Sequence, residues 1–171
     1  MTTTHERPSE EIRILATGGT FDKEYNELDG TLYFEDSHLY EMLKKGRSTL
    51  RINIRTLMMV DSLEMTKSDR EVILHSCLRS EVSKIIITHG TDTMIDTAQL
   101  LKEQITDKTV ILTGALIPYA FGTSDGFFNL GNAIGFVQVL MPGVYICMNG
   151  RIFNPDEVKK NYSTGFFEAI S

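Results

Sequence analysis

The sequence predicts an α/β fold in which one doubly wound, mainly parallel β-sheet carries helices on both faces. Apolar stretches rich in Ile, Val and Leu alternate along the chain with segments whose apolar residues recur at helical spacing. Strands that alternate with helices form a parallel sheet, because each helix carries the chain back across it. The predicted strands are residues 12–16, 51–60, 85–88, 110–112 and 144–148.

Four predicted helices lie between or beside these strands, at residues 36–45, 68–78, 92–103 and 125–140. Asp36 or Ser37 is expected to cap the first helix, and Gly46 to end it. Ser68 and Glu71 have the spacing of a capping box that opens the second. The order of elements predicts a three-layer, Rossmann- or flavodoxin-like arrangement, with one domain over residues 11–171.

Three further segments carry local predictions. Residues 20–35 are polar, contain Gly and are too long for an ordinary connection, so we expect a lid. Asn149 and Gly150 form a dipeptide typical of hairpins, which predicts that residues 151–153 return as an antiparallel edge strand. Residues 1–10 are polar, lack the apolar core of a secretory signal, and are expected to be disordered.

Composition excludes several classes of function. The chain has 171 residues, 42% of them hydrophobic, and a net charge of -6. Its 17 Lys and Arg residues are scattered, which argues against a nucleic-acid partner. No apolar run approaches the ~20 residues that span a bilayer, so we expect a cytoplasmic protein without membrane contact. Cys77 and Cys147 fit neither a disulfide framework nor a zinc site and are expected in the core.

Polar residues follow four of the predicted strands directly. In an open parallel sheet, ligands bind outside the carboxyl ends of the strands, so these segments are expected to form one site for a small polar molecule. They are Thr17-Gly18-Gly19-Thr20, Asp61-Ser62, His89-Gly90-Thr91-Asp92-Thr93 and Thr113-Gly114-Ala115.

Thr20 is the first candidate for chemistry. A threonine hydroxyl is a poor nucleophile in water and requires a base and a group that stabilises the oxyanion. Gly18 and Gly19 let backbone N–H groups approach a ligand, and Lys23 and Tyr25 come within reach if the following connection folds back. The alternative is a purely structural tight turn, and this motif alone leaves both interpretations open.

The other candidates carry charge. Asp92 is expected at the N-cap or first turn of its helix, where it can also hold a substrate ammonium group. His89 could act as a base or metal ligand, but no second His stands at ligand spacing, and a structural role is favoured. Lys160 is a candidate base, since burial disfavours the charged form of a lysine. By composition alone, Glu157, Lys159 and Lys160 instead favour a solvated face.

Two long segments resemble the signature segments of the bacterial-type L-asparaginase/glutaminase family. They are Ile14-Leu15-Ala16-Thr17-Gly18-Gly19-Thr20 and Ile87-Thr88-His89-Gly90-Thr91-Asp92-Thr93-Met94. Three later segments resemble the family in the same order, at residues 110–118 (VILTGALIP), 123–133 (TSDGFFNLGNA) and 148–161 (MNGRIFNPDEVKKN). The resemblance therefore covers nearly the whole chain.

This resemblance implies hydrolysis of a side-chain carboxamide, which releases ammonia and leaves aspartate or glutamate. By motif, Thr20 corresponds to the primary nucleophile, and Thr91, Asp92 and Lys160 to a polar relay. In that relay Lys160 tunes Thr91, while Asp92 holds the α-amino group of the substrate.

The resemblance also implies substrate-binding residues. Ser62, next to Asp61, corresponds to the serine that binds the α-carboxylate. Ala115 would offer backbone groups to the carboxamide, and Gly19, after the first strand, would do the same. Tyr25 corresponds to the tyrosine of a mobile N-terminal flap, with Tyr33 as the alternative. No metal or other cofactor is implied, because a hydroxyl nucleophile with an organic relay needs none.

The chain departs from the family pattern at three places. Leu63 stands where a polar residue touches the substrate amino group, and Phe127 replaces a proline after Asp125-Gly126. Ser171 falls where the first domain of the family stops, so the smaller second domain is expected to be absent. The surface that this domain would cover favours a homo-oligomer, a dimer or a tetramer.

The sequence predicts an asparaginase and leaves alternatives open. One is a module that binds an amino acid without turnover, since a fold does not fix its function. Others are a glutaminase and a subunit that supplies ammonia to a partner enzyme. One methylene changes discrimination by only ~1 to 3 kcal/mol, so asparagine and glutamine are not separated at this stage.

Overall fold

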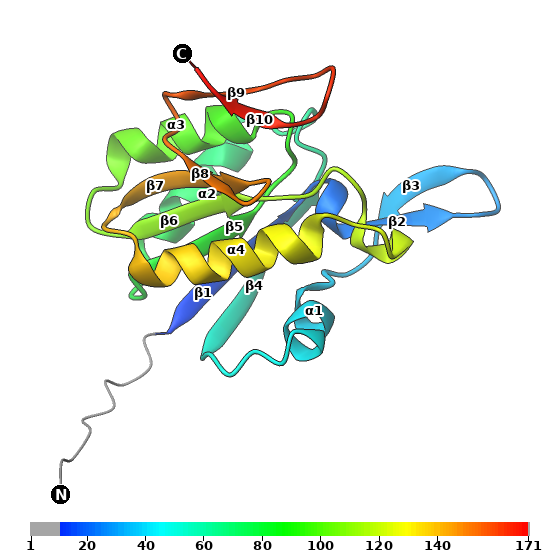
Figure 1. The fold of residues 1–171 in the computed structure, drawn as a ribbon, viewed down its shortest axis with the longest axis horizontal. Coiled ribbons are helices and arrows are strands. Elements are labelled where there is room, and N and C mark those ends of the chain that lie inside the picture. The colour runs from blue at the N-terminus through cyan, green and yellow to red at the C-terminus, as the bar shows by residue number, and fades with distance from the viewer. Residues whose placement is uncertain (1–10, 171) are drawn as a thin grey trace, which may run out of the picture.

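A computed structural model describes residues 11–170 and contains a central sheet between two layers of helices (Figure 1). The strands run in the order β4-β1-β5-β6-β7-β8, and the first five are parallel. Their bounds are Ile52–Val60 (β4), Ile12–Gly18 (β1), Lys84–Thr88 (β5), Thr109–Thr113 (β6), Gly143–Met148 (β7) and Arg151–Phe153 (β8). The predicted fold class is confirmed, and the strand order is that of a flavodoxin-like sheet. The expected disorder of residues 1–10 lies outside the described residues.

Side chains of successive strand residues enter opposite faces of the sheet and build two cores. Ile85 and Ile87 join the core beneath α2 (Lys67–Leu78) and α3 (Met94–Gln104). Ile86, between them, joins the core beneath α1 (Leu39–Lys45) and α4 (Gly126–Val139). All three isoleucines are fully buried, as expected for a parallel strand covered on both faces. Cys77 and Cys147 are buried free thiols, one in each core, which confirms their predicted place.

Helix starts differ from the predictions at two places. The cap of α2 is Thr66, whose hydroxyl accepts from the Asp69 N–H while the Asp69 carboxylate accepts from the Thr66 N–H. The predicted Ser68–Glu71 box is therefore wrong by two residues, because Thr66 has the extended backbone that a cap requires. In α1 the N-cap position is His38, without a side-chain cap, while Gly46 ends the helix as predicted.

The long connection after β1 contains structure that the sequence did not reveal. A short 3-10 helix, η1 (Thr20–Asp22), leads into an antiparallel hairpin of β2 (Lys23–Asn26) and β3 (Thr31–Phe34). The hairpin projects from the right-hand side of the molecule in Figure 1 and touches a second 3-10 helix, η2 (Tyr119–Phe121). A projecting hairpin has the form that the predicted lid requires.

The end of the described chain folds back over the carboxyl ends of the strands. Strand β8 pairs antiparallel with β7, which confirms the edge strand predicted from Asn149 and Gly150. A second hairpin, β9 (Val158–Lys160) and β10 (Phe167–Ala169), was not predicted. It lies beside α3 at the top of Figure 1.

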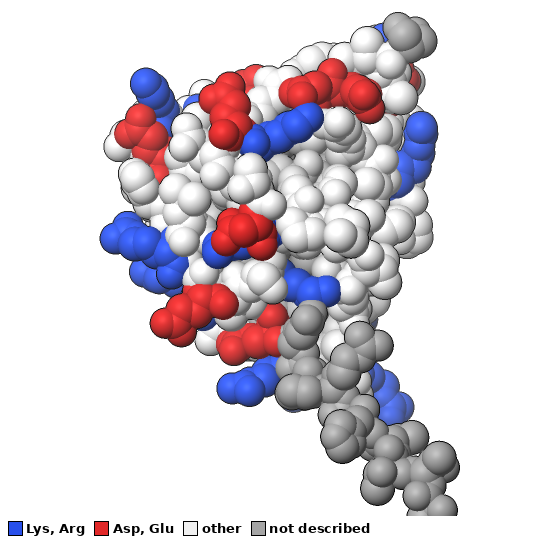
Figure 2. Space-filling view, turned by 90° about the vertical axis from the view of Figure 1, so that its left-hand side faces the viewer, with Lys and Arg blue, Asp and Glu red and all other residues white. Residues whose placement is uncertain are grey.

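On the face drawn in Figure 2, Lys and Arg side chains are interspersed with Asp and Glu side chains. Among residues 11–170, no helix combines the length and the apolar character needed to cross a bilayer.

Candidate active site

The four polar strand ends meet at one edge of the sheet, because β4, β1, β5 and β6 are consecutive neighbours in it. Thr20 follows β1 and Thr91 follows β5. After β1 the chain adds β4 on one side of that strand, and later adds β5 on the other. Thr20 and Thr91 therefore flank the point where the strand order reverses, which is where open α/β sheets bind ligands.

Glycine allows the loops of this edge to touch. Gly19 has a φ of 77°, and a side-chain carbon placed on it would lie 2.4 Å from the backbone nitrogen of Gly90. A side-chain carbon on Gly90 would lie 2.5 Å from the hydroxyl oxygen of Ser62. Only residues without a Cβ fit at these two positions, and they bring the segments that carry Thr20, Thr91 and Ser62 into direct contact.

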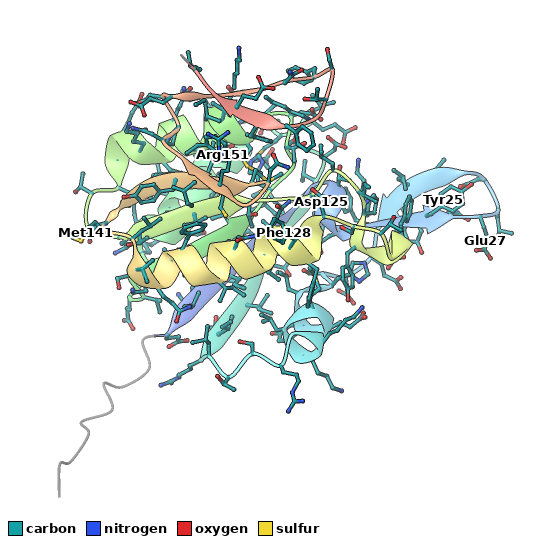
Figure 3. All side chains as sticks on the ribbon, in the orientation of Figure 1. Tyr25, Glu27, Asp125, Phe128, Met141 and Arg151 are labelled. Atoms are coloured by element: carbon teal, nitrogen blue, oxygen red, sulfur yellow. The ribbon has the colours of Figure 1, made fainter. Side chains whose placement is uncertain are left out.

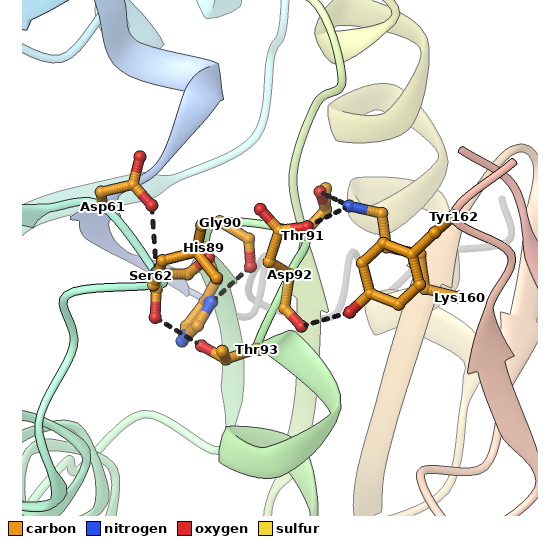
Figure 4. A network of polar contacts seen from close by, with 10 residues as sticks. Asp61, Ser62, His89, Gly90, Thr91, Asp92, Thr93, Lys160 and Tyr162 are labelled. Carbon is orange, nitrogen blue, oxygen red and sulfur yellow. Dashed lines mark hydrogen bonds and ion pairs between the residues drawn. The ribbon is translucent and has the colours of Figure 1, made fainter. Parts of the chain in front are cut away.

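Lys160 joins two of the predicted site residues in what we call the Thr91–Asp92–Lys160 cluster. Its ammonium group donates hydrogen bonds to the Thr91 hydroxyl at 2.8 Å and to Asp92 Oδ1 at 2.5 Å (Figure 4). Thr91 is 4% exposed and the Lys160 side chain 9% exposed, so the contacts are shielded from water. The solvated face that composition alone favoured is not found for Lys160, whose side chain is 9% exposed on the paired strand β9.

Asp92 does not cap its helix. The N-cap of α3 is Thr93, whose hydroxyl donates instead to the Ser62 carbonyl at 2.8 Å. The prediction that Asp92 occupies the N-cap or first turn is therefore wrong, since its carboxylate is turned toward Lys160. The Thr93–Ser62 bond ties the loop after β5 to the loop after β4 (Figure 4).

Asp61 and Lys23 form an ion pair between the end of β4 and the first residue of the flap hairpin. Partial burial acts to raise the pKa of Asp61, but the Lys23 ammonium and the Leu63 N–H outweigh it, and the pKa is lowered. Lys23 was expected to assist Thr20. Instead, this lysine fastens β2 beside Ser62.

The Thr20 hydroxyl and the predicted flap tyrosine share no hydrogen bond among the described residues. Thr20 is half-buried, and no hydrogen bond from another described residue engages its hydroxyl. Tyr25 is 51% exposed and its ring packs edge-on against Phe121, with 6.3 Å between the ring centroids. Figure 3 shows Tyr25 on the projecting hairpin. Tyr33, the alternative, lies opposite Glu24 and is 42% exposed.

Ala115 lies on a segment whose neighbours are held by α4. The amide of Asn129 donates to the Gly114 carbonyl at 2.9 Å, and Asp125 accepts the Leu116 N–H at 3.0 Å. Ala115 itself is 1% exposed. Hydrogen bonds therefore hold the backbone on both sides of Ala115.

Asp22 is a buried carboxylate near Thr20 that sequence reasoning missed. Burial raises the pKa of Asp22, and hydrogen bonds from the His38 N–H and the Ser37 hydroxyl partly oppose that rise. It holds the start of α1 against η1, two residues after Thr20. No sequence pattern distinguishes this aspartate from the acidic residues of the hairpin.

His89 is buried behind the loop that carries Thr91 and is not part of the exposed surface of the site. The ring is fully buried, with Nδ1 2.8 Å from the Gly90 carbonyl oxygen and Nε2 2.8 Å from the Thr97 hydroxyl. Burial lowers its pKa to about 4, so the ring is neutral near pH 7. Across residues 11–170, no group of three His, Cys, Asp or Glu side chains is placed to hold a metal ion.

Comparison with known proteins agrees with this geometry. The family model described as "Asparaginase, N-terminal" matches residues 11–170. The chain belongs to the asparaginase family. Among curated relatives, L-asparaginase 1 of Escherichia coli K12 is 31% identical over 166 residues, which are 91% of this chain and 48% of the relative. The glutaminase-asparaginase of Pseudomonas fluorescens biotype A is 37% identical over 95 residues, covering 52% of this chain and 26% of the relative.

Solved structures of the family share the fold. The thermostable L-asparaginase from Thermococcus kodakarensis superposes with a TM-score of 0.83 at 28% identity, covering 94% of this chain and 51% of that one. The chain therefore spans about half the length of the relatives that match most of it. The predicted family and its fold are both confirmed.

Proposed function

We propose that the protein is an amidohydrolase that converts L-asparagine to L-aspartate and ammonia with Thr20 as the nucleophile. The observation that carries the proposal is the Thr91–Asp92–Lys160 cluster, which stands one strand away from Thr20 at the switch point of the sheet. A hydroxyl, a carboxylate and an amine within hydrogen-bond distance can move a proton during nucleophilic attack. Its membership of the asparaginase family supports the same reaction.

The reaction proceeds through two displacements. The Thr20 oxygen attacks the carbon of the side-chain carboxamide, the C–N bond breaks, and ammonia leaves after its nitrogen takes up a proton. Water then hydrolyses the ester on Thr20 and releases aspartate. Lys160 and Thr91 hold and pass the proton in both steps, and Tyr25 approaches Thr20 when the flap closes.

Other residues of the site hold the substrate. Ser62 binds the α-carboxylate beside Asp61, and Asp92 binds the α-ammonium group through its second carboxylate oxygen, since Oδ1 is engaged by Lys160. Gly19 and Ala115 present backbone groups to the reacting carboxamide. Tyr25 is the better candidate than Tyr33 for the flap tyrosine. Lys23 and Tyr25 are two residues apart in β2 and so lie on the same face of the hairpin, and Lys23 pairs with Asp61 in the site.

L-Glutamine is the second candidate substrate. A relative described as a glutaminase-asparaginase supports it. Discrimination between the two amides depends on the flap, which is open to solvent at Tyr25 in this conformation.

The assay is ammonia release by purified protein from L-asparagine and from L-glutamine, with Thr20→Ala purified in parallel. Release that disappears in Thr20→Ala would support the nucleophile and rank the two substrates. A folded protein that binds L-asparagine in calorimetry but releases no ammonia would be a binding module instead. Activity that appears only with a partner enzyme would support an ammonia-supplying subunit.

We also propose that residues 11–171 act as one domain in a cytoplasmic homo-oligomer, a dimer or a tetramer. Six strands share one sheet, and both cysteines are buried free thiols. Phe128 is 60% exposed and Met141 75% exposed at the two ends of α4, and apolar surface of this kind favours association (Figure 3). Light scattering after gel filtration measures the mass, and a strict monomer would refute the oligomer.

A further inference from the structure

Tyr162 lies beside the Lys160 ammonium group and has no role in the mechanism described above. Lys160 Nζ is 5.1 Å from the centroid of the Tyr162 ring. The hydroxyl at the far end of the same side chain donates a hydrogen bond of 3.3 Å to the main-chain oxygen of Asp92. One side chain therefore contacts two members of the Thr91–Asp92–Lys160 cluster (Figure 4).

The turn that presents Tyr162 is fixed by Asn161. Its side-chain oxygen accepts the Ser163 N–H at 3.0 Å, and its main-chain oxygen accepts the Gly165 N–H at 2.7 Å. Its side-chain amide donates to Glu168 on β10 at 2.9 Å. Because β9 and β10 also pair on either side of the turn, the backbone that carries the ring has little freedom.

The ring of Tyr162 forms the outer wall of the cluster. The Lys160 side chain is 9% exposed, whereas Tyr162 is 73% exposed, so the ring stands between the amine and solvent. An aromatic face attracts an ammonium group within about 6 Å of its centroid. The ring thus contacts the amine in addition to its two oxygen partners and limits the motion of a long, flexible side chain.

We propose that Tyr162 is a positioning residue for amide hydrolysis: its ring holds the Lys160 amine against Thr91 and Asp92, and its hydroxyl fixes the main chain of Asp92. The inference rests on the proposed function, since it concerns the same proton relay. It assigns two separable contributions, one from the electron density of the ring and one from the hydroxyl.

A series of fluorinated phenylalanines at position 162 tests the ring contribution. Each added fluorine withdraws electron density from the ring face while the shape of the side chain hardly changes, so a cation–π contact weakens stepwise. We expect kcat for L-asparagine to fall progressively from phenylalanine to trifluorophenylalanine, by about two- to fivefold in total, with a smaller change in KM. Tyr162→Phe measures the hydroxyl alone, and Tyr162→Leu removes both contributions.

Controls separate this role from packing and from the proposed function. Tyr40 of α1 is exposed to a similar degree, 68%, and Tyr40→Leu should leave kcat unchanged. All variants should keep the wild-type Tm, because Tyr162 is on the surface. Wild-type protein without ammonia release would refute the proposed function itself. In an active wild type, a flat fluorine series would overturn the ring contribution, even if Tyr162→Leu is slow. Wild-type kcat in Tyr162→Phe would overturn the hydroxyl contribution.

Discussion

Acid should destabilise the protein through His89 before it affects the exposed carboxylates. The buried ring has a pKa of about 4, whereas the ordinary value for histidine is 6.5. Below pH 6.5 the unfolded chain binds a proton at this residue that the folded chain does not accept until the pH approaches 4. Proton binding therefore favours the unfolded state, and stability falls as pH is lowered from 6.5 to 4.

The size of the effect follows from the two pKa values. One pH unit between them corresponds to about 1.4 kcal/mol, so the total loss is limited to about 3 kcal/mol. Between pH 7.5 and pH 5 the expected loss from His89 alone is about 2 kcal/mol, because part of the titration lies below pH 5.

Urea unfolding at pH 7.5 and pH 5 measures the free energy of unfolding of wild type and of His89→Gln. Glutamine does not titrate and can still donate toward Gly90 or Thr97. The wild type should lose about 2 kcal/mol more than the variant across this interval. Equal losses in the two proteins, or a folded-state His89 ring that titrates above pH 6 in NMR spectra, would refute the reasoning.

Four other substitutions test the relay, the flap and the backbone. Lys160→Met should lower kcat for ammonia release by at least about a hundredfold, and activity near the wild-type level would exclude the relay. Lys23→Met removes the ion pair with Asp61; amides of the β2–β3 hairpin should then exchange hydrogen about fivefold faster, with Lys23→Arg restoring protection. A side-chain carbon at Gly131 in α4 would have no atom within 4 Å, so Gly131→Ala should raise the free energy of unfolding, measured by urea unfolding, by about 0.5–1 kcal/mol. Gly19→Ala should lower it by more than about 2 kcal/mol, because a positive φ adds to the overlap with Gly90; equal values for the two glycine variants would contradict this packing argument.

The sheet was predictable from the sequence because its strands are buried on both faces. A run such as Ile85-Ile86-Ile87, placed between two predicted helices, indicates a buried parallel strand, and the structure confirms this strand. The hairpins were not predictable in the same way. Strand β2 (KEYN) is polar and β3 (TLYF) is largely exposed, so neither carries the apolar alternation of a half-buried strand. The hairpin instead contacts η2 and is tied to Asp61 by the ion pair of Lys23.

Site residues that directly follow a strand could be predicted from the sequence. Site residues that come from a segment far away in the sequence could not be placed in this way. Ser62 and Thr91 follow strands directly, so the sheet order brings them together. Lys160 is 68 residues from its carboxylate partner, and composition alone favoured a solvated face for it. Tyr162 left no local pattern at all, because its role comes only from the turn that faces Asp92.

The two halves of the site differ in how far they are organised before substrate binds. Lys160 already contacts Thr91 and Asp92 in a shielded position, so the proposed proton transfer needs little rearrangement there. On the Thr20 side, the proposed partner Tyr25 is exposed and packed against Phe121. Lys23 is paired with Asp61 at the base of the hairpin, whereas Tyr25, two residues later, is 51% exposed. In the proposed mechanism, flap closure therefore moves the hairpin beyond the Lys23–Asp61 ion pair, whereas the contacts of the relay are already made.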